Sequence, residues 1–143
     1  MNPLLIIIIL YLLFCSYTDI KKRQIYIPPT LFIICLTLLF KIIYISFSLE
    51  SLGLFLLSFI PGLIMLLISY ITRENIGYGD SILLGLCSLC VGIWNGFFII
   101  MTSFIYSAIF SLFLLIRGKN SKETIPFVPF IFLGTITYLI IGG

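Results

Sequence analysis

The sequence predicts an all-α membrane protein with about six transmembrane helices. Of its 143 residues, 62% are hydrophobic and only 9% are charged, and the mean hydropathy is +1.30. A soluble domain carries roughly 25% charged residues. A helix needs about 20 apolar residues to cross a bilayer, so six such segments nearly fill the chain. We therefore expect residues 1–143 to form a single membrane-embedded domain.

Six apolar runs, separated by short polar segments, define the expected helices. They cover residues 3–17, 30–47, 53–71, 81–93, 96–116 and 126–141. The fourth run is shorter than a full span, so we expect it to be tilted, broken or continuous with neighbouring residues. Pro28, Pro29 and Pro126 mark helix starts, where a missing N–H is tolerated.

The basic residues predict the orientation. Seven of the eight Lys and Arg residues lie in the connections after the first, third and fifth runs. By the positive-inside rule, those connections face the cytoplasm and both termini lie outside. The prediction is a multi-pass protein of the cell (cytoplasmic) membrane. Lys41 is the exception, and we expect it to snorkel to the outer interface.

Several classes of chemistry are disfavoured by composition. The chain has no histidine, which removes Ser–His and Cys–His nucleophile systems and the commonest metal ligand. The net charge is only +3, and the basic residues lie in short clusters between apolar runs and not along one face or tail, so nucleic acid is not an expected partner. Cys87 and Cys90 have the spacing of half a zinc site, but no second pair exists. We expect them to pack between helices, and we expect no metal and no cofactor.

Two aspartates stand at the margins of apolar runs in a chain with only five acidic residues. They are Asp19 and Asp80, and the predicted topology places both near the cytoplasmic boundary. A carboxylate costs about 2.5–3.5 kcal/mol at mid-helix and usually marks function. Taken singly, Asp80 could N-cap the fourth helix, and Asp19 could pair with the basic residues that follow it in solvent.

As a pair, the two aspartates predict a different chemistry. Two carboxylates brought close cannot both ionise easily, so one shared proton supplies an acid and a base at neutral pH. Aspartic proteases hydrolyse peptide bonds in this way, without histidine, metal or cofactor. The glycines Gly77 and Gly79 can adopt positive φ and admit another backbone, which would suit an extended peptide beside Asp80. Tyr17 and Tyr78 could hydrogen-bond to a carboxylate or to substrate, although interfacial anchoring is commoner for tyrosine.

Three sequence elements resemble the type IV prepilin peptidases, which belong to the GxGD membrane aspartyl proteases. The first is Asp19 followed by a basic stretch and Ile27-Pro28, the second is Gly-Tyr-Gly-Asp at residues 77–80, and the third is the segment 122–130 around Pro126. By this resemblance, Asp19 and Asp80 would be the catalytic pair. The substrate would be a pilin-like precursor with a short basic leader, cleaved at the cytoplasmic membrane face.

The chain departs from this family at several positions. Ile82 stands where a lysine is common, Pro29 replaces an asparagine, and Val128 replaces a glycine. These changes bear on substrate preference more than on the reaction. Longer members carry an N-terminal region with paired Cys-x-x-Cys motifs that is associated with N-methylation, whereas this chain begins at the first core helix. The resemblance therefore implies proteolysis without methyl transfer and no need for S-adenosylmethionine.

Two glutamates on the expected cytoplasmic side are candidate contacts for a basic leader. Glu74 and Glu123 would attract it by opposite charge, or they are solvated loop residues. Two other functions stay open. A small proton- or cation-coupled transporter could use Asp19 and Asp80, although transport sites are usually built at mid-membrane. The other open function is an inactive peptidase-like assembly partner. The presence of both aspartates argues against it, whereas Ile82 in place of the common lysine keeps it open.

Overall fold

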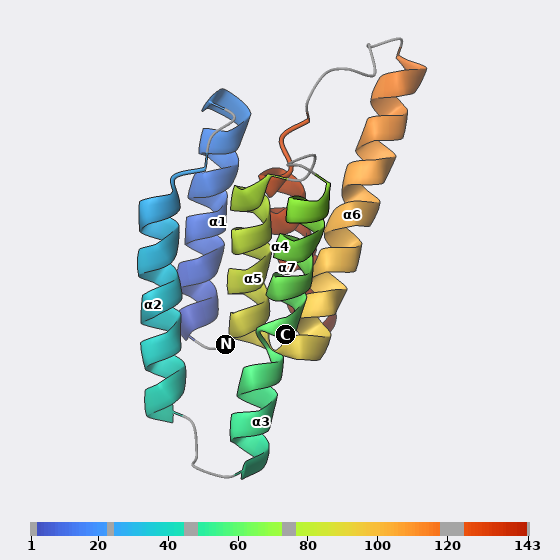
Figure 1. Ribbon diagram of the computed structural model, residues 1–143. Coiled ribbons are helices and arrows are strands. Elements are labelled where there is room, and N and C mark those ends of the chain that lie inside the picture. The colour runs from blue at the N-terminus through green and yellow to red at the C-terminus, as the bar shows by residue number, and fades with distance from the viewer. Residues whose placement is uncertain (1–2, 23–24, 45–48, 73–76, 118–124, 143) are drawn as a thin grey trace.

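The computed structural model describes residues 3–22, 25–44, 49–72, 77–117 and 125–142, and these form helices without any strand (Figure 1). The helices are α1 (Pro3–Lys22), α2 (Ile27–Tyr44), α3 (Leu49–Leu57), α4 (Ile60–Ile71), α5 (Tyr78–Val91), α6 (Ile93–Ile116) and α7 (Val128–Gly142). Three described stretches are long and apolar enough to cross a membrane: Leu4–Lys22, Ser51–Ile71 and Ile93–Ile116. The prediction of an all-α polytopic membrane protein is confirmed.

Helices α3 and α4 together correspond to the single apolar run predicted at residues 53–71. The break between them has a local cause, because Pro61 near the start of α4 has no N–H to continue the ladder of hydrogen bonds. At the bend, the Ser58 hydroxyl donates to the carbonyl of Leu54 at 2.8 Å. The Ser58 carbonyl accepts a hydrogen bond from the Ser88 hydroxyl of α5, also at 2.8 Å. The run is therefore one bent segment that is tied to α5 at its bend.

Helix α5 is short, as expected from the fourth apolar run, but it begins three residues earlier than predicted. It has 14 residues, which at about 1.5 Å per residue gives a length of roughly 21 Å. Gly92 ends it, and α6 follows immediately. The φ of Gly92 is +93°, a conformation that favours glycine and allows the sharp reversal between the two helices.

The centre of the bundle is occupied by α5, which contacts α1, α2, α4, α6 and α7. Its buried Leu83, Leu84 and Leu86 belong to one hydrophobic core with residues of α1, α6 and α7. Small residues let the helices approach closely. A Cβ on Gly62 of α4 would lie 2.7 Å from the Cα of Gly85 of α5. Such close contacts hold membrane helices together, because lipid supplies little hydrophobic drive for their association.

The direction of the helices brings four helix ends together. The C-terminal end of α1 and the N-terminal ends of α2, α5 and α7 lie at the same end of the bundle, uppermost in Figure 1. Lys21 and Lys22 in the last turn of α1 and Arg117 after α6 also lie at this end. The sequence elements that contain Asp19, Asp80 and Pro126 therefore meet here.

Candidate active site

Asp19 lies in the last turn of α1 and is only 7% exposed. Its Oδ2 accepts a hydrogen bond from the backbone N–H of Val128 at 3.1 Å, across 109 positions of the chain. Val128 is the first residue of α7, and the free N–H groups and the dipole at a helix start favour a nearby carboxylate. This carboxylate is therefore buried at the start of another helix and is not solvated, contrary to the single-residue interpretation.

The contact from Val128 was not recognised in the sequence. The donor of this hydrogen bond is the backbone N–H of residue 128, so valine in place of the glycine that is usual in the resembling family leaves the donor unchanged. The neighbouring Pro129 has no N–H, and its presence in the first turn of α7 was a signal of a helix start. The Val128 side chain is fully buried in the core, which fixes the position of the donor. Pro126 lies two residues before α7 and is half-buried.

Asp80 lies in the first turn of α5, at its third residue. The expectation that Asp80 caps this helix is wrong, because Gly77 occupies the N-cap position and no side chain caps it. The Gly77 carbonyl accepts the hydrogen bond from the N–H of Ser81 at 3.2 Å. The Asp80 carboxyl group folds back over Gly77, where a Cβ would lie 3.2 Å from Oδ2. The absence of a side chain at residue 77 therefore leaves room for the carboxyl group.

The two carboxyl groups lie close enough to influence each other's charge. Asp80 precedes the apolar part of α5 and is outside the three candidate spans. Burial, and to a smaller extent the nearby negative charge of Asp19, together raise the pKa of Asp80 from 3.8 to about 7. At neutral pH, Asp80 therefore keeps a substantial share of its proton beside Asp19. This arrangement can supply a general acid and a general base together.

The glycines of the Gly-Tyr-Gly-Asp element serve a different purpose from the one expected. Gly77 has φ −58° and Gly79 lies within α5, so positive φ is not their role; among the described glycines only Gly92 adopts it. Gly79 instead provides space, because a Cβ there would lie 2.8 Å from Cδ1 and 3.0 Å from Cβ of Ile25. Ile25 belongs to the link between α1 and α2. The start of α5 thus packs directly on the segment that follows Asp19.

The remaining predicted residues occupy varied positions. Tyr17 is 60% exposed on α1, and the Lys21 ammonium lies 5.8 Å from the centre of its ring. Tyr78 is partly exposed at the start of α5. Cys87 is fully buried in the hydrophobic core between helices. Glu74 and Glu123 lie outside the described residues.

The packing of Gly79 on Ile25 predicts the effect of one added methyl group. Gly79→Ala should lower the catalytic activity of this site about tenfold, because the added methyl group meets Ile25 and the start of α5 must move together with Asp80. Ile25→Ala removes the atoms that meet this methyl group. The double variant should therefore recover most of the loss in a double-mutant cycle of reaction rates. Equal activity of Gly79→Ala and wild type would show that this contact does not position Asp80.

Comparison with known proteins identifies the family. A family model described as the type IV leader peptidase family matches residues 6–116, well over half of the chain. The match includes both aspartates and the Gly-Tyr-Gly-Asp element, and it ends before the segment around Pro126. Comparisons with curated proteins and with solved structures give no significant match. The expected resemblance is confirmed: the chain belongs to the type IV leader peptidase family.

Proposed function

We propose that this chain is a membrane aspartyl endopeptidase that removes the short basic leader from type IV prepilin-like precursors, pilins or pseudopilins. The observation that carries the proposal is the pairing of Asp19 and Asp80, in which the Asp80 pKa rises to about 7 beside the Asp19 carboxylate. Membership of the leader peptidase family supports a protein substrate and a membrane setting. No metal or cofactor takes part in the proposed reaction.

The environments of the two aspartates differ, and the difference assigns a role to each. Asp19 accepts a hydrogen bond from the N–H of Val128 at the start of α7, and both this hydrogen bond and the helix dipole stabilise the negative charge of Asp19. Asp80 retains its proton because it is buried beside that charge. We assign Asp19 as the general base and Asp80 as the general acid of a coupled pair.

The reaction then proceeds by addition of water. Asp19 takes a proton from water while the water oxygen bonds to the scissile carbonyl carbon, and Asp80 gives its proton to the carbonyl oxygen. The tetrahedral intermediate has no net charge. Its carbon–nitrogen bond breaks as the amide nitrogen takes the proton held by Asp19, and a proton returns from the new acid to Asp80. The products are the leader, with a carboxyl end, and the mature protein, with a free amino end.

The proposed site lies at the end of the bundle that also carries Lys21, Lys22 and Arg117. Basic residues concentrate on the cytoplasmic side of membrane proteins, so we propose cleavage at the cytoplasmic face of the cell membrane. In this proposal, one domain comprising residues 1–143 carries the whole site. Contacts of Glu74 and Glu123 with the basic leader remain predictions from the sequence.

The experiment that tests the function is cleavage of a prepilin-like precursor by the wild-type chain in membranes. N-terminal sequencing should find one new terminus between the basic leader and the hydrophobic helix of the precursor. Added S-adenosylmethionine with a labelled methyl group should leave that terminus unlabelled, since the proposal includes no methyl transfer. Failure to cleave any pilin-like precursor, while the chain is inserted and folded, would favour an inactive assembly partner. Label in the product would contradict proteolysis without N-methylation.

The geometry does not favour the transporter as a second candidate. Asp19 lies in the last turn of α1 and Asp80 in the first turn of α5, so both are at one end of the bundle. A coupled transport site is usually built near the middle of the membrane.

A further inference from the structure

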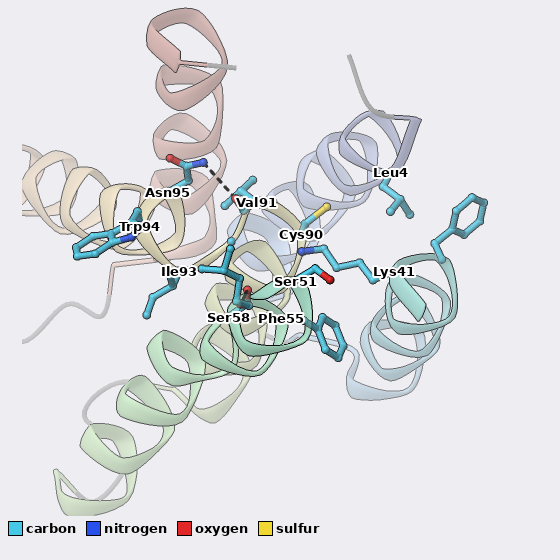
Figure 2. Close-up of a pocket in the computed structure, with 13 residues that line it drawn as sticks. Leu4, Lys41, Ser51, Phe55, Ser58, Cys90, Val91, Ile93, Trp94 and Asn95 are labelled. Atoms are coloured by element: carbon cyan, nitrogen blue, oxygen red, sulfur yellow. Dashed lines mark hydrogen bonds between the residues drawn. The ribbon is translucent and has the colours of Figure 1, made fainter. Parts of the chain in front are cut away.

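A cavity lies at the end of the bundle opposite the aspartates. Its volume is about 620 Å³, within the range of roughly 300–1,000 Å³ that is typical of small-molecule sites. Its lining comes mainly from α2, α3 and the junction of α5 with α6, and the cavity is open on one side (Figure 2). The apolar side chains of Leu54, Phe55 and Ile93 form much of its lining. The proposed peptidase reaction makes no use of this cavity.

One positively charged side chain reaches into this apolar cavity. Lys41, which we expect to snorkel to the outer interface, is half-buried, and its ammonium extends from α2 toward Cys90 and Ser51 (Figure 2). Lys41 and Cys90 are close enough to interact electrostatically. A charge among apolar groups is costly unless an opposite charge accompanies it. The cavity is therefore suited to a ligand with a negatively charged group.

The start of α6 adds a second feature that favours an anion. Ile93, Trp94 and Asn95 form the first turn of α6 and line the cavity. The first N–H groups of a helix have no partners within the helix, and they attract negative charge. The N-terminus of α6 and the Lys41 ammonium thus contribute to the same cavity from different helices.

The surroundings indicate that the ligand comes from the membrane. Trp94 is 78% exposed at the edge of the cavity, and tryptophan is enriched where a bilayer meets water. The exposed Leu54 continues the apolar lining toward the lipid-facing surface of α3. An acyl chain can follow such a surface while a phosphate remains near Lys41. Free phosphate, in contrast, would gain nothing from Leu54 and Phe55.

We propose that this cavity binds one anionic phospholipid, with its phosphate against Lys41 and an acyl chain along Leu54 and Phe55. The lipid comes from the leaflet opposite the aspartates. This proposal does not depend on peptidase activity, and its test does not measure cleavage.

The only tryptophan of the chain provides the measurement, because Trp94 lines the cavity. The full-length protein is placed in micelles that contain phospholipid with brominated acyl chains, which quench tryptophan fluorescence on contact. Phosphatidylglycerol, which is anionic, is compared with zwitterionic phosphatidylcholine. We expect half-maximal quenching of the wild type at a phosphatidylglycerol concentration about tenfold lower than that of phosphatidylcholine, because only the anionic lipid makes a charge-assisted contact with Lys41. Equal quenching by the two lipids would overturn the proposal without any variant.

Variants then locate the charge that selects the lipid. Lys41→Met should remove the preference, and Lys41→Arg should keep it. Lys21→Met, which removes an exposed charge at the other end, should also keep it. Glu50→Gln is a further control. If the preference for phosphatidylglycerol were seen only in this variant, Glu50 would be the normal partner of Lys41, and the proposal would fail. Millimolar inorganic phosphate should not reverse the quenching; reversal would identify a site for the free anion instead of a lipid.

Discussion

Asp19→Asn and Asp80→Asn should each reduce cleavage of a prepilin-like precursor by at least about 10³-fold. The physical reason is that each asparagine keeps the size of the side chain but removes one partner of the shared proton. General acid–base groups typically contribute 10²–10⁴-fold, and members of one catalytic unit do not act additively. The double variant should therefore be no less active than either single variant. The measurement is the initial rate of precursor cleavage in membranes, normalised to the amount of inserted protein.

A matched control separates catalysis from a general effect of removing acidic groups. Glu50 lies at the start of α3, at the opposite end of the bundle from the aspartates. Glu50→Gln should retain cleavage within about twofold, since substitutions far from the catalytic groups usually change little. Cleavage that survives in either aspartate variant would break the assignment of the pair, even if the wild type is a peptidase.

Asp80→Asn should at the same time stabilise the protein at alkaline pH. The Asp80 pKa is about 7 in the folded protein, above its ordinary value of 3.8, because burial and the Asp19 charge disfavour ionisation. The folded state therefore binds this proton more tightly than the unfolded chain. The free energy of unfolding must fall as the pH rises from about 4 to about 7, and the loss is complete above that range. Asparagine cannot ionise and avoids this loss.

The size of this effect follows from the pKa difference. A shift of about three pH units corresponds to roughly 4 kcal/mol in the free energy of unfolding. Denaturant unfolding in detergent micelles measures this difference. Between pH 4 and pH 8, the free energy of unfolding of Asp80→Asn relative to that of the wild type should rise by roughly this amount. Glu50→Gln should show no comparable gain. A gain that does not change with pH would mean that packing of the amide, and not loss of the charge, causes it.

These two predictions together distinguish a catalytic carboxylate from a structural one. A residue that merely supports the fold would lower both activity and stability when it is replaced. A buried carboxylate retained for its chemistry should lower activity and raise stability when its charge is removed, because functional sites often keep groups that are unfavourable for folding. Asp80 is expected to follow the second pattern.

Much of the fold was predictable because it depends on local composition. The apolar runs identified the helices, since each must satisfy its own backbone hydrogen bonds in lipid. The family was predictable from residues that remain close in sequence, such as Gly77, Gly79 and Asp80. The apolar run at residues 53–71 predicts one unbroken helix, because hydropathy does not report an interruption within an apolar segment. Pro61 is the sequence feature that indicates the bend at Ser58.

The sequence alone determined that this chain is a membrane protein and placed Asp19 and Asp80 at one end of it. Only the tertiary structure decided what surrounds them: the Val128 N–H on Asp19, the space that Gly79 leaves for Ile25, and the entry of Lys41 into a cavity. The physical reason is the separation in sequence of the residues that interact. Hydropathy and charge act segment by segment along the chain, whereas these contacts depend on how helices distant in sequence rotate and pack against one another.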